Sequence, residues 1–121
     1  MPSPYIYNCE VIKIVDGDTI DVDIDLGFSV ILKKQRVRLA GIDAPESRTR
    51  NLAEKALGLK AKERLKELCG GGMMLKSLGR GKYGRILGIP INAKGRDICQ
   101  ILIKEGHAIE YWAGKKKHIW A

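Results

Sequence analysis

The chain has 121 residues, and its 22 Lys plus Arg against 14 Asp plus Glu give a formal net charge of +8 at pH 7. This length excludes two separate cores, so we expect one domain over residues 1–121, with a core over about 5–112 and a basic tail over 113–121. The positive charge favours nucleic acid over a membrane, because no apolar run approaches the ~20 residues that cross a bilayer.

The start of the chain, MPSPYIYNCE, has neither the basic nor the apolar segment of a signal peptide, so we expect a cytoplasmic protein. We also expect it to be a monomer. Cys9, Cys69 and Cys99 are odd in number and widely spaced. This spacing predicts neither a disulfide framework nor a zinc site, and we interpret all three as reduced, small hydrophobic residues.

Three strands are predicted between Tyr5 and Ala40, in the segments YIYNCEVIKIV, TIDVDIDL and FSVILKKQRVRLA, because β-branched and alternating residues dominate them. A compact turn at Asp16–Asp18 separates the first two strands, and Gly27 lets the chain reverse or bulge after the second. In TIDVDID, acids alternate with apolar residues. One face of this strand should therefore be wet and the other buried.

A helix is predicted over Asn51–Cys69, with Asn51 or Thr49 as its N-cap and Gly70 as its end. The segment is rich in Ala, Leu, Lys and Glu, which are strong helix formers. The apolar residues that recur at helical spacing are Leu52, Ala56, Leu59, Leu65 and Leu68.

Two short strands, MMLKSLG and RILGIPI, should follow on either side of the basic turn GRGKYGR, and Asp97 should cap a short helix that ends at Gly106. The order β-β-β-α-β-β-α favours an α+β fold. A five-stranded barrel of the OB type with two to three helices suits this length, and such barrels often bind oligonucleotides on one face.

Four acids lie near turns: Asp16 and Asp18 in DGDT, and Asp43 and Glu46 in GIDAPE. If the strands form a meander, Asp18 and Asp43 meet at one end of the sheet. Two carboxylates and a backbone carbonyl suit Ca²⁺ or Mg²⁺, and the absence of a nearby imidazole or thiolate disfavours zinc. Each motif alone can also be an ordinary turn.

Basic residues lie close to these acids in sequence. Arg36 and Arg38 share one face of a strand and could bind phosphate, or could simply be solvated. In GKYGR, Lys82 and Arg85 could bind a phosphate and Tyr83 could stack on a base. The same three residues could instead be surface residues of an ordinary hairpin loop.

Taken together, VIKIVDGDTI, RVRLAGIDAPE, the central helix, GKYGR and GRDICQILIKEGHA are similar in order and spacing to the staphylococcal nuclease (thermonuclease) family. The likeness runs from about Val11 to Tyr111. It implies an OB-type barrel with helices. It also implies Ca²⁺-dependent hydrolysis of phosphodiester bonds in single-stranded DNA and RNA, leaving 3′-phosphate ends.

The resemblance also implies roles for individual residues. Asp18 and Asp43 correspond to the calcium-binding carboxylates, the backbone carbonyl of Ala44 to a third ligand, and Asp16 to an acid just outside the ligand set. Ala44 departs from the family, which commonly has a hydroxyl residue at this position. The backbone ligand should be unaffected, but a hydroxyl that could order water is lost.

The remaining implied roles concern the reaction and the substrate. Glu46 corresponds to the acid that orients or deprotonates the attacking water, and Arg38 and Arg85 to the arginines that stabilise the transition state. The substrate contacts implied are Lys82 and Tyr83 at a terminal phosphate and Tyr111 against the nucleotide. His107 and His118 lie away from these motifs in sequence, and we expect structural or surface roles for them.

Two other functions are compatible with the same composition. One is a noncatalytic OB-type module that binds single-stranded nucleic acid, and the other is a domain that docks on a protein through its Lys-rich helix. The presence of every implied acid and arginine favours the enzyme, a Ca²⁺-dependent nuclease.

Overall fold

The computed structural model describes residues 5–70, 72–80 and 84–111. Within them it places the following elements in chain order: β1 (Ile6–Asp16), β2 (Thr19–Gly27), β3 (Val30–Leu39), β4 (Ile42–Asp43), α1 (Leu52–Cys69), β5 (Met73–Arg80), β6 (Ile86–Asn92), α2 (Ile98–Lys104) and β7 (Ile109–Glu110). The three predicted N-terminal strands, the long helix, the next two strands and the short helix are all present.

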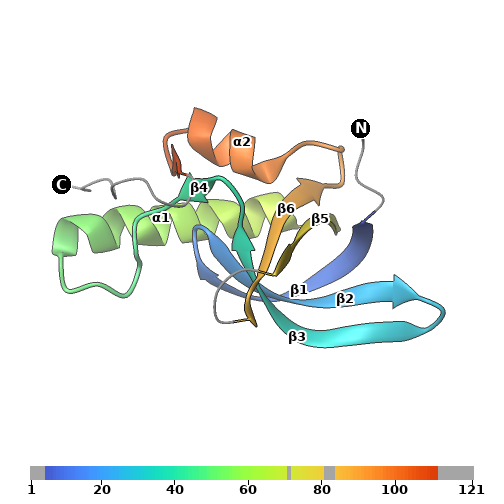
Figure 1. The fold of residues 1–121 in the computed structure, drawn as a ribbon. Coiled ribbons are helices and arrows are strands. Elements are labelled where there is room, and N and C mark those ends of the chain that lie inside the picture. The colour runs from blue at the N-terminus through green and yellow to red at the C-terminus, as the bar shows by residue number, and fades with distance from the viewer. Residues whose placement is uncertain (1–4, 71, 81–83, 112–121) are drawn as a thin grey trace.

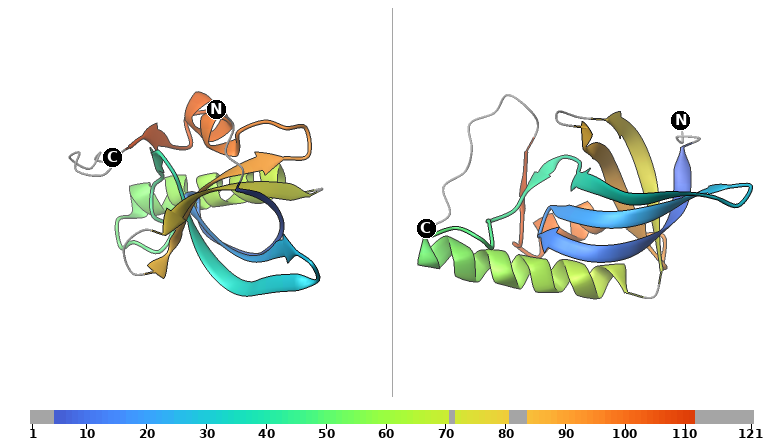
Figure 2. Two further views of the ribbon diagram at one scale, coloured as in Figure 1. Left: turned by 45° about the vertical axis from the view of Figure 1, so that its right-hand side comes forward. Right: turned by 90° about the horizontal axis from the view of Figure 1, so that it is seen from below.

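Five strands close into a barrel in the order β1-β2-β3-β6-β5 (Figure 1). The β3–β6 pair is parallel, whereas the other four pairs of neighbours are antiparallel. Helix α1 lies along the outside of the barrel and packs against β1 (Figure 2). The expected α+β fold with a five-stranded OB-type barrel is confirmed.

Alternation along β2 builds one wall of the core. Ile20 and Val22 are fully buried and Ile24 is nearly so, whereas the intervening Asp21 and Asp23 lie on the outer face. The outer acids pair with basic residues of β3, Asp21 with Arg36 and Asp23 with Lys33. The predicted division of this strand into a wet and a buried face is confirmed.

Helix α1 begins where Asn51 caps it, because the Asn51 Oδ1 accepts a hydrogen bond of 3.1 Å from the Glu54 N–H. The buried side of α1 consists of Gly58, Ala61, Leu65 and Cys69. The apolar face of this helix that the leucine spacing predicts is wrong in its N-terminal half, since Leu52 is 79% exposed and Leu59 is 49% exposed. The buried positions in this half of the helix hold small residues, Gly58 and Ala61, because the turns that precede the helix approach it closely.

Two strands of two residues each, β4 and β7, were not predicted. They pair with each other, Ile42 with Glu110 and Asp43 with Ile109. Just beyond this pair, the Tyr111 N–H donates to the Gly41 carbonyl at 2.9 Å. The segment that follows α2 is thereby tied to the GID turn.

The β2–β3 hairpin projects from the barrel (Figure 1). Gly27 ends β2 with φ of 83°, next to an irregularity in the pairing of β2 with β3 between Asp25 and Gly27, as the expected bulge requires, and the reversal itself falls on Phe28 and Ser29, with φ of 56° and 63°. Phe28 is fully exposed at the tip. Neither residue is of the kind that favours positive φ, so the turn is strained.

Cys69 and Cys99 are buried and Cys9 is partly buried, in keeping with their interpretation as small hydrophobic residues. All three are free thiols, and burial raises the pKa of Cys9 to about 11 and that of Cys69 to about 12. They therefore stay protonated at neutral pH. Neither helix of the described part of the chain is long and apolar enough to cross a membrane.

Candidate active site

The turn between β1 and β2 meets the segment that follows β3 through the side chain of Asp18. This carboxylate is buried: its Oδ1 accepts a bond of 2.9 Å from the Thr19 hydroxyl, and its Oδ2 accepts one of 2.9 Å from the Ala44 N–H. Asp43, the residue before Ala44, is buried as well. The DGDT and GIDAPE motifs, 25 positions apart at Asp18 and Asp43, therefore converge as predicted.

Arg38 lies between the two acids. Its Nη2 is 3.7 Å from the Asp18 Oδ2 and 3.7 Å from the Asp43 Oδ1, while its Nη1 donates to the Leu39 carbonyl at 2.9 Å. Only 20% of the Arg38 side chain and about a tenth of each acid side chain are exposed. One guanidinium thus partly neutralises two carboxylates in a place largely shielded from water.

Glu46 stands on the next turn, and its backbone is held from two sides. Its N–H donates to the Glu54 Oε2 of α1 at 3.0 Å. The following residue, Ser47, donates both its N–H and its hydroxyl to the Asp16 Oδ1. Pro45 on the other side is buried, whereas Glu46 itself is exposed. A solvent-facing carboxylate is therefore carried by a firmly held backbone.

Both turns rest on the small residues of α1. A Cβ added at Gly17 would lie 2.7 Å from the Ala61 Cβ, and one added at Gly58 would lie 2.4 Å from the Glu46 carbonyl oxygen. Larger residues at positions 58 and 61 would push the turns away from the helix. Sequence reasoning missed Gly58, although a glycine inside a run of strong helix formers is itself a signal.

Arg85 immediately precedes β6, which pairs with β3 in parallel. Val37 is opposite Ile86 and both are buried, so the neighbouring Arg38 and Arg85 belong to the outer side of the barrel wall. Arg85 is half-buried there. The predicted contacts Lys82 and Tyr83 lie outside the described residues. Tyr111 is half-buried and tied to Gly41, two residues before Asp43.

The donors present fit a hard cation better than zinc. Among the residues that the structure describes, no group of three or more His, Cys, Asp or Glu side chains could hold a metal ion. Asp18 and Asp43 supply two carboxylates, beside the backbone of Ala44. Ca²⁺ accepts such an oxygen set completed by carbonyl groups and water, whereas a structural zinc site needs four mainly thiolate or imidazole ligands.

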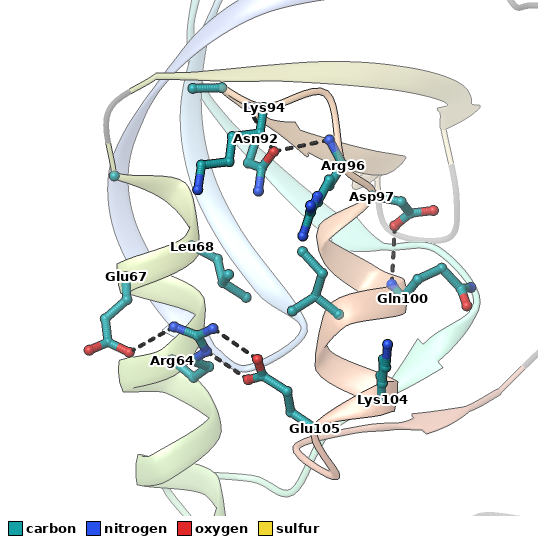
Figure 3. A pocket seen from close by; sticks show the side chains of 13 residues that line it. Arg64, Glu67, Leu68, Asn92, Lys94, Arg96, Asp97, Gln100, Lys104 and Glu105 are labelled. Carbon is teal, nitrogen blue, oxygen red and sulfur yellow. Dashed lines mark hydrogen bonds and ion pairs between the residues drawn. The ribbon is translucent and has the colours of Figure 1, made fainter.

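A separate hollow of about 930 Å³ lies between α1 and α2, and none of the candidate site residues lines it (Figure 3). Across its floor, Arg64 donates to both carboxylate oxygens of Glu105 at 2.7 and 2.8 Å and to Glu67 at 3.3 Å. This ion pair ties α2 to α1. His107 belongs to the same region, since its Nε2 is 3.9 Å from the Glu105 Oε1, and His118 lies outside the described residues.

Comparison with known proteins gives a consistent result. The family model described as "Staphylococcal nuclease homologue" matches residues 36–119. The chain is 36% identical over 113 residues to "Micrococcal nuclease" of Shigella flexneri, covering 84% of this chain and 57% of that protein. It is 34% identical over 105 residues to "Endonuclease YncB" of Bacillus subtilis (strain 168), covering 84% of this chain and 46% of that protein. The chain thus spans about half the length of these two relatives.

Proposed function

The chain belongs to the family of staphylococcal nuclease homologues, and we propose that it is a nuclease that hydrolyses phosphodiester bonds in single-stranded DNA, RNA or both. The observation that carries this proposal is the position of Arg38, whose Nη2 lies 3.7 Å from carboxylate oxygens of both Asp18 and Asp43. A guanidinium beside two shielded carboxylates offers a phosphate ligand next to a place for a cation. The names of the relatives, nuclease and endonuclease, point the same way.

We propose Ca²⁺ as the cation, held by Asp18, Asp43 and the backbone carbonyl of Ala44. When bound, it would polarise a phosphate oxygen and make a nearby water more acidic. Asp16 lies outside this set, and its bonds to Ser47 fix the turn that follows the ligands. This assignment uses the two buried carboxylates that the fold brings together.

Three side chains would act on the reacting phosphate. Glu46 orients a water for in-line attack and accepts its proton, while Arg38 and Arg85 stabilise the negative charge that grows on the phosphate oxygens. The bond that breaks joins phosphorus to the 5′-oxygen, which takes a proton from water and leaves as a 5′-hydroxyl, so the phosphate stays on the 3′-end. The proposed substrate contacts are Lys82, Tyr83 and Tyr111.

A noncatalytic module that binds single-stranded nucleic acid is the second candidate. The observation that favours it is again Arg38, because an arginine between Asp18 and Asp43 can neutralise these acids without a cation. Ala44 at a position where the family commonly has a hydroxyl points in the same direction. Under this alternative the basic surface binds the strand and no bond is cut.

Cleavage of labelled single-stranded DNA and RNA, with Ca²⁺ or with a chelator, separates the two candidates. The proposal predicts cleavage with Ca²⁺ that stops with the chelator, is lost in Asp43→Asn and falls at least ~100-fold in Glu46→Ala. Glu10→Gln, an exposed acid of β1, is the matched control and should keep full activity. Tight binding without cleavage would establish the second candidate instead.

A further inference from the structure

Both peptide groups of Glu46 meet the first half of α1. The N–H donates to the Glu54 carboxylate at 3.0 Å. The carbonyl oxygen faces Gly58, where a Cβ would lie only 2.4 Å away, and the Glu46 carbonyl carbon and the Ser47 nitrogen would be nearly as close. These neighbours are backbone atoms, so they could make room only if the whole turn moved.

The bond made by Glu54 is unusual for its place in the helix. Glu54 is the third residue after the cap Asn51, and an acid at this position commonly reaches back to the N–H of the cap residue. Here the Asn51 N–H is already bonded to the Thr49 hydroxyl at 3.2 Å. The Glu54 carboxylate instead accepts the N–H of Glu46, eight residues earlier.

Gly58 is also unusual for its place. It lies in the interior of an 18-residue helix of mostly strong helix formers, where glycine is less favourable than alanine. The close approach of the Glu46 carbonyl explains why no side chain fits there. The helix therefore accepts a local loss of stability at the place where the Glu46 carbonyl approaches it.

We propose that Glu54 and Gly58 are positioning residues that fix the Glu46 carboxylate for attack, an inference that rests on the proposed nuclease function. The Glu46 side chain is exposed, and the position of its carboxylate depends on where its backbone lies. Helix α1 fixes that backbone by one hydrogen bond and one close contact. To bring the 2.4 Å contact to the ordinary 3.4 Å, the turn must shift by about 1 Å, and a misplacement of that size can cost about 100-fold in turnover.

Steady-state kinetics on single-stranded DNA with saturating Ca²⁺ test the proposal. Gly58→Ala should lower kcat by about 100-fold and leave KM within about threefold, because the contact orients the attacking water and not the strand. Glu54→Ala should lower kcat by about tenfold, and Glu54→Gln should restore most of it, because an amide oxygen still accepts the Glu46 N–H. Glu63→Ala removes an exposed acid of the same helix and should change neither constant.

Two kinetic results would overturn the proposal: an unchanged kcat in both Gly58→Ala and Glu54→Ala, or a loss in Glu54→Gln as large as in Glu54→Ala. A merely structural role would instead lower the melting temperature and the fraction of active protein, and kcat per active molecule would stay constant. If Gly58→Ala does not fold, the Glu54 pair still decides.

Amide hydrogen exchange separates this inference from the proposed function. The Glu46 amide should be protected in the wild type, should exchange about tenfold faster in Glu54→Ala, and should be unaffected in Glu63→Ala. Equal exchange in all three proteins would overturn the positioning contact whatever the activity. A protected Glu46 amide in a wild type that cuts no nucleic acid would overturn the proposed function, and with it the catalytic purpose of the contact.

Discussion

Replacement of Arg38 by methionine should destabilise the protein strongly, because it leaves two buried carboxylates without their shared cation. At 3.7 Å and an effective dielectric of about 20, each attraction is about 4 kcal/mol before desolvation. Loss of one partner from a shielded ion pair typically costs about 3 kcal/mol. For a domain of this size, that corresponds to a fall in melting temperature of roughly 10 °C.

The assay is chemical denaturation at pH 7 in a chelator, with Arg36→Met as the matched control. Arg36 is two residues away on the same strand and pairs with Asp21, but half of its side chain is exposed, so its loss should cost at most about 1 kcal/mol. Added Ca²⁺ should stabilise Arg38→Met more than the wild type, since the cation and Arg38 neutralise the same acids. Equal stability of the two variants, or no greater effect of Ca²⁺ on Arg38→Met, would refute this reasoning.

Three further predictions concern other parts of the chain. Phe28→Asn with Ser29→Gly should stabilise the protein by about 1–2 kcal/mol in denaturant, because these residues suit the positive φ of the hairpin turn; no gain would contradict the strain. Arg64 holds the pKa of Glu105 below its ordinary value of 4.5, so their pair stabilises above that pH and is lost as pH falls through the lowered pKa. The difference in melting temperature between wild type and Glu105→Gln should therefore shrink from about pH 7 to about pH 3, and a constant difference would count against the pair. Lys115–Lys117 lie outside the described residues, and their replacement by glutamine should make the slope of log affinity for single strands against log salt concentration shallower by up to about two, with kcat unchanged. An identical slope would show that these lysines do not contribute to binding.

Much of the fold could be predicted because its signals are local. Alternation of Ile20, Val22 and Ile24 with acids identifies a strand with one wet face, and Asp97 marks the start of α2. The convergence of Asp18 and Asp43 followed from a simple meander of three strands. Such features depend on few residues and on short stretches of chain.

The parts that sequence could not supply depend on close approach between distant segments. Strands β4 and β7 have two residues each, too few to leave a pattern. The buried side of α1 was misjudged because leucine spacing ignores Gly58 and Ala61, which are buried since the turns press against them. The bond from Glu46 to Glu54 likewise depends on Thr49 occupying the cap N–H, which no spacing rule predicts.

A crystal structure with Ca²⁺ and a nucleotide that carries a 3′-phosphate tests the central proposal most directly. We expect a cation bound by Asp18, Asp43 and the Ala44 carbonyl, with Arg38 turned from the acids to the phosphate. Arg38 still between Asp18 and Asp43, with no cation beside them at high Ca²⁺, would contradict it.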